Sequence, residues 1–157
     1  MEGVTRDRVY SSAEWLSQEF NIIDTGGYVS SNEDIFNEKI KVQISAAIEE
    51  CDGVIFLVDG KEGRNPNDQF LSKIIRKSGK KFVVGVNKCD TPEHDIRKDQ
   101  FFDMGFENPI PISALNGAGV GDMLDNLFEL IDFNMISQSN DNTDCSIAIV
   151  GMPNVGK

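Results

Sequence analysis

The sequence lacks several features that would point to other classes of protein. No apolar run in its 157 residues approaches the roughly 18–20 residues that a membrane helix needs, so we expect no membrane partner. Residues 1–7 have no apolar core behind a basic flank, which predicts that no signal peptide is present. The three cysteines are widely spaced and form no CxxC pair. We therefore expect neither a disulfide framework nor a zinc site, and a reducing compartment such as the cytoplasm fits this pattern.

Basic residues are also scarce. There are 15 Lys and Arg against 26 Asp and Glu, which gives a net charge of −11. Because phosphates must be neutralised by basic side chains, this balance argues against strong direct binding of nucleic acid. It does not exclude a nucleotide, which needs only a local pocket. The hydrophobic fraction of 39%, with ten Phe, is enough for a folded chain of about one domain.

The predicted strands and helices alternate along the chain. Residues 8–15 and 18–24 predict two strands joined by a tight turn, and the continuous apolar run 53–58 is typical of a strand covered on both faces. Helical spacing or helix-start signals predict four helices, at 33–50, from Asn65-Pro66 onward, at 91–104 and at 120–131. Further strands are expected at 82–86, 109–112 and 145–150. This alternation predicts an α/β fold with a mostly parallel sheet, which binds ligands at the carboxyl ends of its strands.

Two polar clusters follow strands at that expected ligand edge. The first is the D-x-x-G of Asp24 to Gly27, whose Asp can hold a hydrated Mg²⁺ and whose glycines let backbone amides approach a phosphate. Taken alone, this pattern is more typical of an ordinary turn. The second is the N-K-x-D of Asn87, Lys88 and Asp90, which is more specific. Its Asp can accept hydrogen bonds from N1 and the exocyclic amine of guanine, a donor pair that adenine lacks.

A phosphate-binding pattern ends the sequence. Residues 151–157 read G-M-P-N-V-G-K directly after a predicted strand, which matches G-x-x-x-x-G-K in the context that this motif requires. In such a loop the backbone amides surround phosphates and the lysine contacts the outer phosphate oxygens. We therefore expect Gly151, Gly156 and Lys157 to bind phosphate. The Ser or Thr that would bind Mg²⁺ and the following helix are not in the sequence, so we expect hydrolysis by this chain to be weak or absent.

These motifs, in this order and with Ser113-Ala114 after a further strand, resemble a Ras-like P-loop GTPase of the translation-factor class. That resemblance implies a three-layer α/β sandwich. More narrowly, the segments GVTRDR, DTGG, VNKCD, PISALNGAGVGDML and IVGMPNVGK resemble the Der family, bacterial GTPases with two tandem G domains. The family resemblance implies GTP or GDP with Mg²⁺ as ligands, hydrolysis of GTP, and a role in assembly of the large ribosomal subunit.

The resemblance also implies roles for individual residues. Thr5 would meet Mg²⁺ and the γ-phosphate, Asp24 and Gly27 would form the second switch, and Asn154 would help hold a monovalent cation such as K⁺ near the phosphates. Recognition of the guanine base is implied for Asn87, Lys88, Asp90, Ser113 and Ala114.

The order of the motifs differs from that of the family, in which a strand, a phosphate loop and a helix precede GVTRDR. We expect residues 1–132 to be a first G domain without its own phosphate loop, 133–144 a linker, and 145–157 the first strand and truncated phosphate loop of a second. An empty slot in the sheet would expose two strand edges. We therefore predict that 145–150 inserts between the strand of Ile22-Ile23 and the strand 53–58, in a circularly permuted sheet or in a neighbouring molecule.

Two classes of function remain open at this point. The first is a guanine-nucleotide switch enzyme. The second is a non-catalytic interaction module that keeps the fold while its phosphate site is incomplete.

Overall fold

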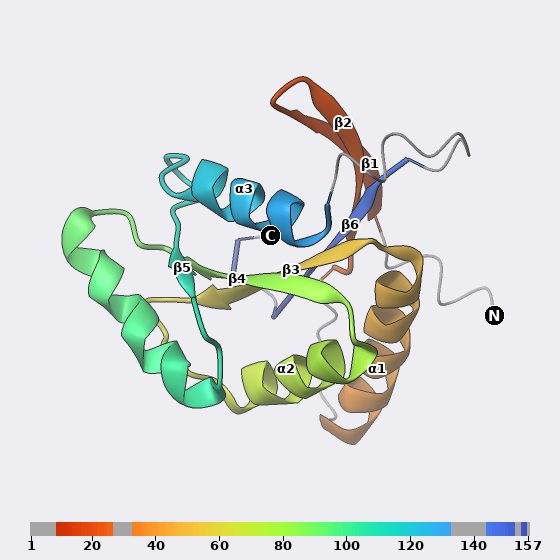
Figure 1. Cartoon of the computed structure of the whole chain (residues 1–157). Coiled ribbons are helices and arrows are strands. Elements are labelled where there is room, and N and C mark those ends of the chain that lie inside the picture. Colours follow the sequence, from red (N-terminus) through yellow and green to blue (C-terminus); the bar gives the residue numbers. More distant parts are fainter. Residues whose placement is uncertain (1–8, 27–32, 133–143, 153–154, 157) are drawn as a thin grey trace.

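The computed structural model describes residues 9–26, 33–132, 144–152 and 155–156. Figure 1 shows the chain as one sheet with helices on both of its faces. The elements in chain order are β1 (Val9–Trp15), β2 (Gln18–Asp24), α1 (Glu33–Glu50), β3 (Gly53–Asp59), α2 (Pro66–Ser78), β4 (Lys81–Asn87), the 3-10 helix η1 (Pro92–Met104), β5 (Ile110–Pro111), α3 (Val120–Leu130) and β6 (Ser146–Gly151). The predicted alternation of strands and helices is confirmed.

Local sequence explains most of the element boundaries. The β1–β2 turn places Leu16 and Ser17 at φ 50° and 64°, the backbone that a two-residue hairpin requires. Helix α2 begins with a capping box, in which Asn65 accepts from the first turn and the Asp68 side chain accepts from the Asn65 amide. Strand β5 is shorter than the predicted 109–112. Two prolines flank Ile110, and proline has no N–H to donate to a neighbouring strand.

The C-terminal strand occupies the centre of the sheet. The strand order is β1-β2-β6-β3-β4-β5, and only the β1–β2 pair is antiparallel. In register, Ile147 of β6 lies beside Ile22 of β2, and Ile149 of β6 lies beside Ile55 of β3. The prediction that this strand fills the slot between those two is therefore confirmed, and it does so within the same chain.

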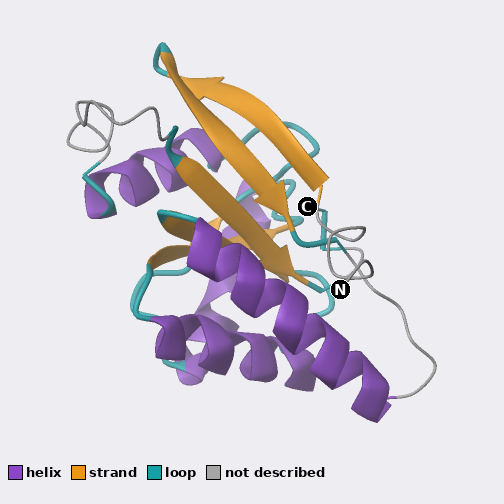
Figure 2. Cartoon of the chain, turned by 90° about the vertical axis from the view of Figure 1, so that its right-hand side faces the viewer, coloured by secondary structure: helices purple, strands orange, loops and turns teal. Residues whose placement is uncertain are grey.

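Helices cover both faces of the sheet (Figures 1 and 2), and a hydrophobic core lies on each face. Side chains alternate along β3: Phe56 and Val58 point into the core shared with α1, α2 and η1, and Ile55 and Leu57 into the core under α3. Strand β3 is buried along its whole length, as the continuous apolar run predicted. The result is the three-layer sandwich that the family resemblance implied. In the described ranges, no helix is both long and apolar enough to cross a membrane.

Candidate functional site

The carboxyl ends of the parallel strands bring the sequence motifs to one edge of the sheet. Asp24 ends β2 beside Ile149 of β6, and Gly151 ends β6 beside Leu57 of β3. On the next pair, Asn87 ends β4 opposite Asp59 at the end of β3. The D-x-x-G, N-K-x-D and G-x-x-x-x-G segments thus meet at the edge where α/β sheets bind ligands.

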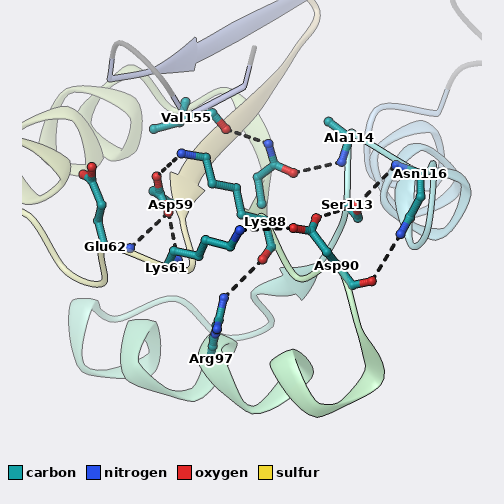
Figure 3. A network of polar contacts seen from close by, with 11 residues as sticks. Asp59, Lys61, Glu62, Lys88, Asp90, Arg97, Ser113, Ala114, Asn116 and Val155 are labelled. Atoms are coloured by element: carbon teal, nitrogen blue, oxygen red, sulfur yellow. Dashed lines mark hydrogen bonds and ion pairs between the residues drawn. The ribbon is translucent and has the colours of Figure 1, made fainter.

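Asn87 connects the N-K-x-D segment to the phosphate-loop motif and to the loop after β5. Its side-chain Nδ2 donates to the carbonyl oxygen of Val155 at 2.6 Å, and its Oδ1 accepts from the amide of Ala114 at 2.9 Å. Asn87 is only 4% exposed; its bond to Val155 is buried, and its bond to Ala114 is partly buried. The side chain thus joins the end of the phosphate-loop motif to the loop that carries Ser113 and Ala114. Its two partners, Val155 and Ala114, are labelled in Figure 3.

Glycine is required in the phosphate-loop motif for two local reasons. Gly156 has a φ of +91°, and a Cβ atom there would lie 2.3 Å from Nδ2 of Asn87. A Cβ on Gly151 would lie 2.7 Å from the carbonyl oxygen of Leu57. Both contacts are closer than a side chain tolerates, so these two glycines allow the loop to approach β3 and Asn87.

Asp90 is held by a small polar network. The hydroxyl of Ser113 donates to Asp90 Oδ1 at 2.8 Å, and the Lys61 ammonium lies 3.3 Å from Oδ2. The hydrogen bond from Ser113, followed by the contact with Lys61, lowers the pKa of the Asp90 carboxyl below its ordinary value. Asn116 supports both partners, donating its backbone amide to Ser113 Oγ and its side chain to the Asp90 carbonyl. The carboxylate is therefore ionised and oriented as an acceptor (Figure 3).

Lys88 pairs with a residue that the sequence motifs did not include. Its backbone is left-handed, with φ 67°, and its Nζ lies 2.5 Å from Asp59 Oδ2. Asp59 is 4% exposed, and its other oxygen accepts from the amides of Lys61 and Glu62. Burial alone would raise the pKa of Asp59, but the hydrogen bonds from Lys88 and the two amides outweigh it and lower the pKa.

Asp59 belongs to none of the sequence motifs, and its pairing with Lys88 comes from tertiary structure. One oxygen of Asp59 accepts from the backbone of the turn after β3, and the other binds the ammonium group of Lys88. The signal that would have found it is its position at a strand end directly opposite Asn87.

Asp24 has the chemistry expected of a magnesium ligand. Its Oδ1 accepts from the Gly26 amide at 2.9 Å, which orients the carboxylate at the sheet edge. Within the described part of the chain, no group of three or more His, Cys, Asp and Glu gathers to hold a metal ion. A single carboxylate fits Mg²⁺, which keeps several waters and takes its remaining ligands from substrate phosphates. Asp24 therefore fits the role predicted for it.

Several predicted residues lie outside the described ranges. They are Thr5, Gly27, Asn154 and Lys157, together with residues 133–143 of the predicted linker. Their predicted roles stay predictions. The described part of the site contains Asp24, Asn87, Lys88, Asp90, Ser113, Ala114, Gly151 and Gly156.

Comparison with known proteins agrees with this geometry. The family described as the Elongation factor Tu GTP binding domain matches residues 1–132. GTPase Der of Macrococcus caseolyticus is 44% identical over 155 residues, which is 99% of this chain and 35% of that protein. GTPase Der of Clostridium novyi is 43% identical over 157 residues, 100% of this chain and 36% of that protein. The chain thus spans about a third of the length of these curated relatives.

The fold also matches solved structures. A crystal structure of Era in complex with MgGDPNP and nucleotides 1506–1542 of 16S ribosomal RNA aligns with a TM-score of 0.64 at 23% identity. The alignment covers 81% of this chain and 45% of the Era chain. At this level of identity the likeness concerns the fold alone.

Proposed function

Because the chain belongs to the Elongation factor Tu GTP binding domain family, we propose that it binds a guanine nucleotide across the sheet edge described above. The base lies against the N-K-x-D segment and the phosphates lie at the loop that follows β6. The observation that carries this proposal is the hydrogen bond from Asn87 to Val155, which joins the two segments. Base recognition and phosphate binding are thereby built on one rigid connection.

Selection of guanine rests on Asp90. An ionised carboxylate fixed by Ser113 accepts from N1–H and from the exocyclic amine, and adenine has no such pair of donors. Ser113 and Ala114 close the pocket, and the aliphatic stem of Lys88 supports the face of the ring. Lys61 occupies Asp90 Oδ2 at 3.3 Å, so it must move when the base enters.

The phosphate side uses the loop glycines and Asp24. Gly151 and Gly156 let backbone amides approach the phosphates, and Asp24 would hold a hydrated Mg²⁺. When bound, that ion would neutralise charge on the phosphates. A monovalent ion such as K⁺ beside Asn154 belongs to the same proposal.

Hydrolysis of GTP and a role in ribosome assembly are the finer parts of the proposal. The similarity to GTPase Der over nearly the whole chain supports hydrolysis of GTP. The role in ribosome assembly is what the resemblance to the Der family implies, and the Era structure, which is similar in fold, was solved with a segment of ribosomal RNA. Residues 1–132 would form the first of two G domains, 133–144 a linker and 145–157 the start of the second. The three cysteines are buried and are not joined in disulfides, which supports a reducing compartment such as the cytoplasm.

A titration with fluorescent GDP tests nucleotide binding. We expect saturable binding that GTP displaces and ATP does not, and we expect Asp90→Ala to abolish it. Asp103→Ala is the matched control, because Asp103 is an exposed carboxylate on η1 that pairs only with Arg64 among the described residues. If the folded parent chain binds no GDP up to millimolar nucleotide, the proposal fails and the chain is an interaction module. Trp15 fluorescence reports whether each variant is folded.

A further inference from the structure

A groove of about 460 Å³ lies between α1 and α2, which run side by side on the sheet face opposite α3 (Figure 2). Helix α1 lines it from Lys41 to Glu49, and α2 from Phe70 to Ser78. None of the lining residues belongs to the nucleotide motifs. Its volume lies within the range of ligand-binding pockets.

The groove concentrates positive charge in an acidic protein. Four of the fifteen Lys and Arg residues line it, against one of the twenty-six Asp and Glu, which is Glu49. Lys41, Lys73 and Lys77 are exposed and make no ion pair with any residue that the structure describes. Lys80 donates to the carbonyl of Cys51 at 2.8 Å and is held at the end of the groove. The three exposed ammonium groups are therefore available to an acidic ligand.

The bottom of the groove is apolar. Ile48 is 2% exposed and belongs to the core, and Phe70 and Ile74 are partly buried against that core. On α2, Phe70, Ile74, Lys73 and Lys77 follow the spacing of three and four residues that places side chains on one helix face. An apolar strip is thus flanked by ammonium groups, which matches an amphipathic ligand with carboxylates beside an apolar side chain.

We propose that this groove binds a short acidic peptide segment of a partner protein. Carboxylates of the peptide pair with Lys41, Lys73 and Lys77, and an apolar side chain lies on Phe70 and Ile74. The span from Lys41 to Glu49 is about 12 Å at 1.5 Å per residue, which fits two to three turns of a helix. Docking of an amphipathic helix into a groove between helices is a common mode of peptide recognition.

The same features disfavour nucleic acid as the occupant. The net charge of −11 repels an extended polyanion beyond the groove, whereas a short peptide carries only a few charges. The apolar strip consists of two aliphatic side chains, Ile48 and Ile74, and one aromatic ring, Phe70, which packs against the core. Single-stranded nucleic acid instead stacks its bases on exposed aromatic rings along a basic path.

Fluorescence anisotropy with a defined probe tests the proposal. The probe is a fluorescein-labelled helical peptide of Glu, Leu and Ala, about 12 residues long, with its Leu on one face. A peptide with every Glu replaced by Gln, and an oligouridylate of equal length, are the comparison ligands. At low ionic strength we expect the Glu peptide to bind the full chain at least about tenfold more tightly than the Gln peptide, and the RNA not to displace it.

Paired substitutions locate the binding site. Lys73→Gln with Lys77→Gln should weaken binding of the Glu peptide at least about tenfold, whereas Lys81→Gln with Lys98→Gln, the same charge change elsewhere, should weaken it less than about twofold. Lys73, Lys77 and Lys81 are exposed and Lys98 is partly exposed, so the variants should fold as the parent does. Equal weakening by both pairs, no binding at millimolar peptide, or displacement of the peptide by RNA would overturn the proposal.

Discussion

Asn87 and Val155 are 68 residues apart in the chain, and the side chain of the first donates to the carbonyl of the second at 2.6 Å. This contact exists because β6 lies between β2 and β3, which brings the loop after Gly151 to the end of β4. The same Asn87 side chain accepts from Ala114. One buried carboxamide thus sets the position of the phosphate-loop segment relative to the base-recognition segment.

Asn87→Ala should destabilise the chain and abolish GDP binding. The substitution leaves the Val155 carbonyl and the Ala114 amide without their partner, at a cost of about 1–3 kcal/mol for each group that stays buried. Urea unfolding followed by Trp15 fluorescence measures this loss. Asn126→Ala is the control, since that side chain makes one exposed bond to Asp122 and should change stability by less than about 1 kcal/mol. Equal effects of the two substitutions would contradict the central role of Asn87.

Gly156→Ala should weaken GDP binding more than Gly117→Ala does. Both glycines have a positive φ, +91° and +83°, so both substitutions carry a similar backbone strain of about 1 kcal/mol. A Cβ on Gly156 would also collide with Asn87 Nδ2, whereas nothing lies within 4 Å of one on Gly117. We therefore expect a larger loss of stability and of affinity at residue 156. Matching losses for the two variants would mean that the contact with Asn87 has no role in the site.

Lys61→Met should raise the affinity for GDP. Lys61 pairs with Asp90 Oδ2, an oxygen that the guanine base needs, so removing the ammonium removes a competitor. Because the Lys61 side chain is 53% exposed, the gain should be small, up to about fivefold, the range of a surface ion pair. Calorimetric titration measures it, with Lys98→Met as the charge-matched control. A lower affinity in Lys61→Met would show that the lysine assists the nucleotide.

Asp68→Asn should stabilise the chain in a pH-dependent way. Asp68 is 3% exposed, and among the described residues its Oδ1 has no hydrogen-bond partner. Burial raises the pKa of Asp68 to about 6; the hydrogen bond from the Asn65 amide opposes this rise, and the Asp59 and Glu62 carboxylates add to it. The pKa in the folded chain is therefore above that in the unfolded chain. The contribution of Asp68 to the stability of the folded chain is therefore fully present below about pH 4, and it is lost as the pH rises through about 6.

The measurement is the free energy of unfolding of Asp68→Asn and the parent between pH 4 and pH 8. We expect little difference at the acid end and a gain of about 1–3 kcal/mol in the variant above neutral pH. Asp122→Asn, an exposed residue in the first turn of α3, should show no such trend. A difference that does not change with pH would rule out titration of Asp68 as its cause.

Much of the fold could be predicted because local patterns and tertiary structure agree. The buried run of β3, the start of α2 at Asn65-Pro66 and the insertion of β6 followed from apolar runs, helix-start residues and the need to cover strand edges. The meeting of the N-K-x-D segment with Ser113-Ala114 was also predictable, because both lie directly after strands of one parallel sheet. Strand ends determine where such side chains meet.

Other features depend on contacts that one stretch of sequence does not contain. The pairing of Lys88 with Asp59 joins the ends of two strands, and Asp59 alone has the pattern of a turn. The contact of Lys61 with Asp90 depends on the path of a loop. The groove between α1 and α2 is lined by residues of both helices. In the sequence, the spacing of these residues indicates only that each helix has a buried face.

The most direct test of the guanine site is an exchange of base specificity at Asp90. Xanthine has a carbonyl where guanine has its exocyclic amine, so Asp90→Asn should turn an acceptor into a donor while Ser113 still has an oxygen to bond. Calorimetric titration of both proteins with GDP and XDP measures the exchange. We expect the parent to prefer GDP and Asp90→Asn to prefer XDP, each by at least about a hundredfold. If folded Asp90→Asn keeps the preference of the parent, or the parent binds both nucleotides equally, Asp90 does not read the base.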